Sequence, residues 1–199
     1  MIYLTNEKTE KEVKYIHYGD IHSTFKSELL DVEKVIIPYL KDEFVDESKL
    51  NYLTEGDLVI ADASEDYKGI GECIELKNVK NTKIIGGLHT IVARSRDNQT
   101  HNGFRTYIFN SHLVSKSLKT IATGISVYGI SKGNLSKLKL PIPPRPEQKA
   151  IADCLSTWDK AIEKQNALIT QKELSKKALM QQLLSGKKRV KGFEDQKGT

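Results

Sequence analysis

One segment constrains this chain more than any other: residues 147–185 contain neither proline nor glycine. The six residues before it, 141–146, include four prolines. Proline removes a backbone donor and forces its predecessor into extended geometry, so we expect 141–146 to be a stiff connector. Pro146 suits the first turn of a helix, and Gly186 suits its end. The pattern predicts one helix over 147–186, about 60 Å long at about 1.5 Å per residue.

Apolar side chains recur along this helix at alternating steps of four and three residues. Three of the ten positions in the series are polar, namely Gln165, Lys172 and Lys176. The apolar positions, which we call the seam, are Ile151, Leu155, Trp158, Ile162, Ile169, Leu179 and Leu183. This repeat is typical of a coiled coil. A helix of about 60 Å exceeds what one small domain can cover, so we expect it to pair with a partner helix rather than fold back on its own domain.

Before residue 140, short apolar runs punctuated by glycine and polar turns are typical of strands. We expect strands at 57–61, 71–76, 88–93 and 104–109, and a helix at 111–123 that Gly124 ends. The fold class predicted is therefore α+β. A mixed α/β domain covers 1–140, and the connector 141–146, the long coiled-coil helix 147–186 and a basic tail 187–199 follow it.

Charge is distributed unevenly along the chain, whose net charge is +5. Residues 1–66 hold 7 Lys and Arg against 16 Asp and Glu. Residues 67–138 hold 11 against 3, and residues 139–199 hold 13 against 7. A polyanion would approach the last two parts and avoid the first. The alternative is a chance asymmetry on a solvated surface.

The polar segment 97–103 lies between two predicted strands and has arginines on both sides. Arg, Asn and Gln can form paired hydrogen bonds with base edges, so this loop is a candidate reader of DNA, although a solvated hairpin tip would have a similar composition. The candidate base-reading residues are Arg94, Arg96, Asn98, Gln99, Asn102 and Arg105. The candidate phosphate contacts are Lys68, Lys116, Lys119 and Lys132.

Motifs for catalysis or cofactor binding are missing. Residues 124–131 have the glycine spacing of a phosphate-binding loop but carry Ile130 where lysine is needed. Residues 69–74 lack the third glycine of a dinucleotide-binding loop. Neither a serine nor a cysteine has an obvious histidine partner. We therefore expect no catalytic residue and no cofactor in this chain.

A metal site is not expected either. Strand geometry would put His17 and His22 on opposite faces. The carboxylates Asp57, Asp62, Glu65 and Asp66 suggest a nuclease, but no lysine follows at a recognisable spacing. The two cysteines, Cys73 and Cys154, have no second ligand at metal spacing. No stretch is apolar enough to span a membrane, and nothing at the N-terminus is typical of a secretory signal, so we expect a cytoplasmic protein.

Several motifs together resemble the specificity (S) subunits of type I restriction–modification systems. The start of the family's conserved helical region is similar to residues 140–144, Glu147, Gln148, Ile151, Ala152, Leu155, Asp159 and Ile162. Its end resembles residues 177–189 and Gly192–Phe193. Its target recognition domain is similar to residues 18–21, 57–62 and 122–124, with Ile130, Ser131 and Leu135.

The resemblance implies a DNA-recognition subunit that is not itself an enzyme. Such subunits bind double-stranded DNA and dock methyltransferase (M) subunits, which hold S-adenosylmethionine. Restriction (R) subunits with an ATP-driven motor can join them. The competing interpretation is a coiled-coil scaffold protein without a DNA role.

One departure from the family is that its members carry two recognition domains and two helical regions, whereas this chain holds one of each. It is either a half-subunit or the C-terminal half of a larger one. A half-subunit would form a homodimer through the long helix, in an antiparallel coiled coil. Two identical readers related by a two-fold axis would read a palindromic, two-part target, with the helix pair fixing the distance between its halves.

Overall fold

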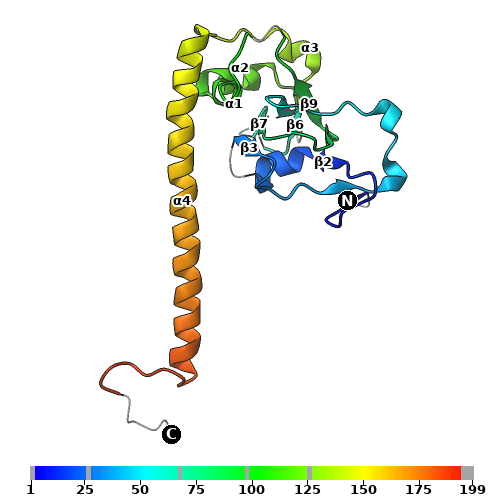
Figure 1. Cartoon of the computed structure of the whole chain (residues 1–199). Helices are drawn as coiled ribbons and strands as arrows, with labels where there is room; N and C mark the ends of the chain where they lie inside the picture. The colour runs from blue at the N-terminus through cyan, green and yellow to red at the C-terminus, as the bar shows by residue number, and fades with distance from the viewer. Residues whose placement is uncertain (1–2, 26–27, 67–68, 97–98, 125–126, 194–199) are drawn as a thin grey trace. The chain divides into compact units, whose positions relative to one another are not determined.

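The computed structural model describes residues 3–25, 28–66, 69–96, 99–124 and 127–193 (Figure 1). The chain divides into two compact units, Met1–Ser156 and Thr157–Thr199. The described strands and short helices belong to the first unit, and most of the long helix α4 (Arg145–Leu184) belongs to the second. A mixed α+β unit with one long C-terminal helix is the fold class that the sequence predicted, and it is confirmed.

A four-stranded sheet forms the centre of the first unit. Its order is β3 (Leu29–Asp31), β7 (Cys73–Lys77), β5 (Leu58–Ala61) and β9 (Thr90–Ala93). β5 pairs antiparallel with β7 and β9, whereas β3 is parallel to β7. All four residues of β5 are buried, as expected for a continuous apolar run in a central strand covered on both faces.

Two smaller sheets complete the strand layers. The first has the order β1 (Leu4–Thr5), β4 (Tyr39–Leu40), β2 (Lys14–Ile16) and β8 (Ile84–Gly86), with β2 parallel to β8. The second pairs β6 (Ala63–Ser64) with β10 (Tyr128–Gly129). Short turns of helix, η1 (Asp20–Thr24), η2 (Asp42–Phe44) and η3 (Glu47–Lys49), connect strands in the N-terminal part.

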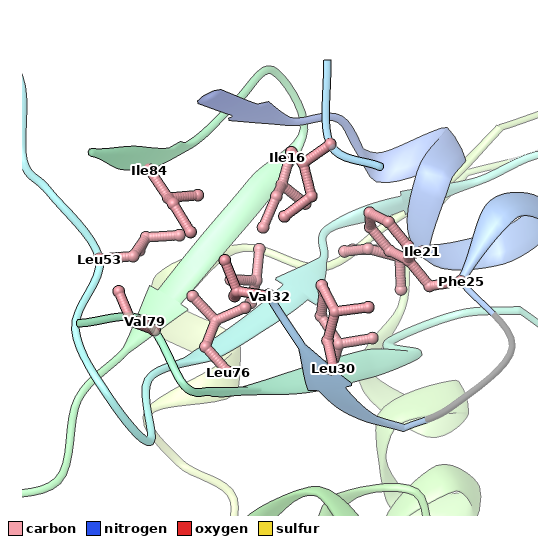
Figure 2. Close-up of a cluster of buried hydrophobic side chains, with 13 residues drawn as sticks. Ile16, Ile21, Phe25, Leu30, Val32, Leu53, Leu76, Val79 and Ile84 are labelled. Atoms are coloured by element: carbon pink, nitrogen blue, oxygen red, sulfur yellow. The ribbon is translucent and has the colours of Figure 1, made fainter. Parts of the chain in front are cut away.

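The two faces of β5 contact different parts of the core because successive side chains of a strand point in opposite directions. Val59 and Ala61 belong to the cluster of buried hydrophobic residues drawn in Figure 2. This cluster also contains residues of β2, β3, β7, β8 and η1. Leu58 and Ile60 belong to a second cluster. That cluster includes Phe109 of α1 (Arg105–Phe109) and two residues of α2 (His112–Ile121), so these helices cover the opposite face of the sheet.

The helix expected at 111–123 is α2, which begins after Ser111. The Ser111 hydroxyl caps it by accepting a hydrogen bond from Val114 N (3.4 Å). Ser131 caps the short α3 (Lys132–Leu135) in the same way, through Asn134 N (3.1 Å). Asn134 Nδ2 also donates to Ile121 O (3.3 Å), which fixes α3 against the end of α2.

The prediction of a strand at 104–109 is wrong, because Arg105–Phe109 forms helix α1. Aromatic and polar residues alternate over this stretch, as they do in a strand, but a tertiary contact decides the outcome. The buried carboxylate of Glu75 accepts hydrogen bonds from Gly103 N (2.6 Å) and Thr106 N (3.1 Å). A negative charge at these free N–H groups favours the start of a helix.

The long helix α4 covers Arg145–Leu184, 40 residues without interruption. It begins with Pro146 in its first turn and ends shortly before Gly186, as the sequence indicated. The compact first unit extends beyond residue 140, where we expected its end, because Gln148 and Ala152 of α4 are buried in it. None of the described helices has the length and apolar character needed to cross a membrane.

Candidate nucleic-acid interface

The candidate reading loop, residues 94–104, connects β9 to α1, and residues 97–98 within it lie outside the described part of the chain. Three buried polar residues hold its base. They are Glu75 (0% exposed), Arg105 (8%) and Gln148 (1%), which we call the loop-base cluster. Buried polar and charged groups are tolerated only when they are paired, so the partners of these three residues explain how the loop is held.

Glu75 is the charged residue at the centre of the loop-base cluster. It projects from β7, and its carboxylate accepts the hydrogen bonds from Gly103 and Thr106 described above. Arg105 Nη1 lies 3.7 Å from its Oε1. Burial raises the pKa of Glu75 above its ordinary value, and the N–H donors and Arg105 partly offset this shift because they stabilise the charged form.

Arg105 is an internal anchor of the loop. Its Nε donates to Thr100 Oγ1 (2.6 Å), its Nη2 donates to Thr100 O (3.1 Å), and its Nη1 donates to Gly56 O. Gly56 adopts φ +78°, and a Cβ there would lie 2.4 Å from Arg105 Nη1 and 2.7 Å from Asn102 Oδ1. We predicted Arg105 as a base-reading residue. The structure instead gives its buried guanidinium a structural role.

Gln148 connects the loop to the beginning of α4. Its Oε1 accepts from His101 N (2.7 Å), and its Nε2 donates to Gln99 O (3.2 Å) and to Pro143 O (2.8 Å). All the hydrogen-bonding atoms of this side-chain amide therefore have partners, and the partners come from the loop and from the proline-rich connector.

Arg94 is also held by a carboxylate. Its Nε and Nη2 donate to the two oxygens of Asp57 at 2.8 and 2.6 Å, and its Nη2 donates to Tyr52 O at 3.0 Å. Asp57 is 1% exposed, and the hydrogen bonds to its carboxylate, together with its charge, raise the pKa of Arg94. The Nε–Nη2 edge of this guanidinium is therefore bound to Asp57, while the Arg94 side chain remains 48% exposed.

Three other predicted base-reading residues, Arg96, Gln99 and Asn102, are exposed on the loop. Asn98 and Lys68 lie outside the described residues. Lys116 on α2 and Lys132 on α3 are exposed, and Lys119 on α2 is half-buried. Because α3 is fixed against α2, these three lysines belong to one helical layer of the first unit.

Three of the four carboxylates considered for a nuclease site have other partners. Asp57 pairs with Arg94, Asp62 Oδ1 lies 3.2 Å from His89 Nδ1, and Asp66 accepts a hydrogen bond from Gly69 N (2.6 Å). His22 lies next to Glu72, with 2.7 Å between Nδ1 and Oε2. Within the described ranges, no three His, Cys, Asp or Glu residues are grouped so as to hold a metal ion.

The seam of α4 presents apolar side chains to solvent. Trp158 is 67% exposed, Ile162 57% and Ile169 54%, and Ile151 and Leu183 are half-buried. Further large apolar residues that lie outside the seam are also exposed, namely Leu168, Leu174, Met180 and Leu184. An apolar surface of this extent along one helix is typical of a site that binds another protein segment.

The seam begins in an apolar pocket of the first unit with a volume of about 580 Å³. Ile151 and Leu155 of the seam line this pocket together with residues of α1 and the connector, including Phe104, Tyr107 and Ile142. The heptad pattern predicted the seam but not this pocket, because the pocket depends on α1, a stretch predicted as a strand.

Sequence reasoning also missed Glu75 and Gln148 as parts of the site. Glu75 had one available signal, because it is a charged residue inside an otherwise apolar strand. Gln148 had a weaker one, since it lies in the first turn of a helix directly after the connector. Apart from Pro143, the partners described for these two side chains are groups far away in the sequence, and no local pattern records such partners.

Comparisons with known proteins agree with this architecture. The family model described as "Type I restriction modification DNA specificity domain" matches residues 2–173. The type I restriction enzyme MjaVIII specificity subunit of Methanocaldococcus jannaschii is 29% identical over 159 residues, which are 79% of this chain and 37% of that protein. The structure is also similar to the crystal structure of a type-I restriction-modification system S subunit from M. genitalium, with 15% identity and a TM-score of 0.56. The matched region covers 93% of this chain and 41% of that S subunit chain. The chain thus spans less than half the length of either protein.

Proposed function

The chain belongs to the type I restriction modification DNA specificity domain family, and from this premise we propose that it recognises one half of a two-part DNA target within a restriction–modification complex. The observation that carries the proposal is loop 94–104, which exposes Arg96, Gln99 and Asn102, with the backbone of residues 99–103 held by the loop-base cluster. Side chains that read bases need a fixed backbone, because freedom in the loop would have to be lost on binding.

Base recognition is assigned to the exposed polar side chains of the loop. Arg can pair with the O6 and N7 atoms of guanine, and Asn or Gln can pair with the N6 and N7 atoms of adenine. Arg96, Gln99 and Asn102 therefore carry the sequence preference in this proposal, together with Asn98. Arg94 and Arg105 support the loop through Asp57 and Thr100.

Affinity that does not depend on sequence is assigned to the lysines. Lys116, Lys119 and Lys132, together with Lys68, contact phosphates, which position the domain on the duplex without reading it. Replacing Lys116 and Lys132 by alanine should lower the slope of log affinity against log salt by about two, since each phosphate contact contributes about 0.9. An unchanged slope would remove these residues from the interface.

The seam of α4 is assigned to pairing with a second copy of the chain. In an antiparallel arrangement, the two-fold axis would put one recognition domain at each end of the helix pair. The exposed apolar side chains of the seam support this assignment, because burying them against a partner would remove them from water. The helix pair would then set the number of unread base pairs between half-sites.

Catalysis is assigned to partner subunits. In this proposal the chain docks methyltransferase subunits that bind S-adenosylmethionine, restriction subunits join the complex, and the chain itself acts without a cofactor or metal, as a cytoplasmic protein. The resemblance to specificity subunits supports this division of labour.

The proposal is tested by base-resolution mapping of modified DNA in cells that express the chain with its methyltransferase partner. We expect methylation at a palindromic site of two parts with a fixed spacing. A variant with Arg96→Ala and Gln99→Ala should methylate a wider set of half-sites, because each paired base contact contributes roughly 1–3 kcal/mol of discrimination. Random methylation by the unaltered chain would contradict the function, and an unchanged site in the variant would contradict the residues assigned.

A further inference from the structure

Gln148 is the one member of the loop-base cluster that lies outside the loop, its sheet and α1. It is in the first turn of α4, it is 1% exposed, and its amide bonds to the backbone of Gln99, His101 and Pro143. Resting on the function proposed above, we propose that Gln148 is a positioning residue for sequence specificity. It holds the backbone of Gln99 and His101 in the conformation that reads DNA, and it ties this part of the loop to the start of α4.

Glutamine is suited to this position because its side chain both accepts and donates. One N–H group and two carbonyl oxygens face it, and the primary amide supplies one acceptor and two donors. Glutamate has the same length and keeps the acceptor for His101, but it turns a carboxylate oxygen toward the two carbonyls. Methionine fills a similar volume and forms none of the three bonds.

The hydrogen bonds of Gln148 lie at or next to the candidate base-reading residues Gln99 and Asn102. Gln99 O accepts from Gln148 directly, so the backbone that carries the Gln99 side chain is fixed. His101 N, also bound by Gln148, immediately precedes Asn102. The other members of the cluster hold the neighbouring positions, through the bonds of Arg105 to Thr100 and of Glu75 to Gly103. Gln99 and Asn102 are exposed, so their side chains lie on a backbone that is held from within.

The hydrogen bond of Gln148 to Pro143 O connects the loop to the proline-rich connector before α4. Pro144 O accepts from Glu147 N (2.9 Å) and Gln148 N (3.1 Å), so the connector turns directly into the helix. Gln148 Nε2 adds the bond to Pro143 O and reaches the loop from the same atom. A displacement of the first turn of α4 would therefore displace the backbone of Gln99 and His101.

The positioning role can be tested first without DNA, by amide hydrogen exchange. In Gln148→Met, the His101 amide should lose protection by about tenfold or more, because its buried acceptor is gone. Amides of β5 and β7 should exchange as in the unaltered chain. Gln171→Met, at an exposed position of α4, is the matched control. It should change neither the protection of the His101 amide nor that of the amides in β5 and β7. Unchanged protection at His101 in Gln148→Met would overturn the proposal.

The second test measures specificity with the chain assembled with its methyltransferase partner. Gln148→Met should lower discrimination between the cognate half-site and single-base variants by about tenfold, as expected when one paired base contact is misplaced. The salt dependence of DNA affinity should stay the same, because the phosphate contacts do not change. Gln148→Glu keeps the acceptor for His101 N but replaces the donors to Gln99 O and Pro143 O by a carboxylate oxygen, so it should keep more protection at His101 than Gln148→Met and still lose discrimination. If the methionine variant does not fold, unchanged discrimination in Gln148→Glu would overturn the proposal.

The two proposals fail in different ways. If the unaltered chain directs no sequence-specific methylation, the proposed function fails, whatever Gln148 does. If the unaltered chain reads a defined target and Gln148→Met, with an unprotected His101, reads the same target with the same discrimination, then the positioning role is contradicted and the function stands.

Discussion

At the base of loop 94–104, three charged or amide side chains are buried with hydrogen-bond partners, and several of these bonds join segments distant in sequence. Glu75 binds the N–H groups that begin α1, Arg105 binds Thr100 and Gly56, and Gln148 binds the loop and the connector. Desolvation of such groups is costly unless their partners are present, so the loss of one partner costs more than the bond itself contributes.

Arg105→Ala should therefore lower the free energy of unfolding by about 3 kcal/mol, because it removes the buried bonds to Thr100 and Gly56 and the cation beside the buried Glu75. Arg96→Ala, on the exposed part of the same loop, is the matched control and should change it by less than about 0.5 kcal/mol. Denaturant unfolding measures both values. Equal stabilities for the two variants would mean that Arg105 is not the anchor that its contacts indicate.

The pair His22 and Glu72 makes stability depend on pH. The hydrogen bond to Glu72 is the main cause that raises the pKa of His22 above its ordinary 6.5. A raised folded-state pKa means that the pair stabilises the fold fully below pH 6.5, and that this contribution disappears as pH rises through the folded-state value. Glu72→Gln should therefore destabilise the protein in acid and much less in alkali. Thermal unfolding of the unaltered chain and of Glu72→Gln, measured in acid and in alkali, checks this. A difference in stability between the two proteins that is the same at both conditions would contradict it.

Among the elements, those with strong local patterns were predicted well. The apolar runs at 57–61 and 88–93 correspond to β5 and β9, the amphipathic run at 111–123 to α2, and the proline-to-glycine interval to α4. The strands β1, β2 and β4 were not predicted, because two or three residues are too few for a periodicity to be seen. They form through pairing with distant partners, such as β2 with β8.

The candidate site was predictable only in part, for the same reason. The polar composition of the loop identified Arg96, Gln99 and Asn102, which are exposed. Composition could not separate them from Arg105, which has the same chemistry but lies against Gly56 and Thr100 in the interior. Burial is a tertiary property, and composition does not show which arginine of the loop is buried and which is exposed.

The seam of α4 makes a prediction at the scale of one element. Trp158→Asp should prevent pairing of the helix, because it would bury a charge in an apolar interface. Lys160→Asp introduces the same residue two positions away, outside the seam, and should leave pairing intact. Size-exclusion chromatography with light scattering measures the mass of each. If Trp158→Asp keeps the oligomeric state of the unaltered chain, the seam is not the pairing surface.

The whole molecule combines two kinds of structure. The first unit supplies a loop whose backbone is held by buried polar bonds, and α4 supplies a long helix with an exposed apolar seam. A two-fold pair of such chains would touch DNA at two places, at a separation that the length of the helix pair sets. The distance between half-sites should therefore follow the number of residues in α4.

This claim is tested most directly by lengthening the helix. Duplicating residues 160–166 adds one heptad, which keeps the seam in register and lengthens the helix pair by about 10.5 Å at about 1.5 Å per residue. Base-resolution methylation mapping should then show the same two half-sites separated by about three additional base pairs, at about 3.4 Å each. Modified sites with the original spacing would contradict the account.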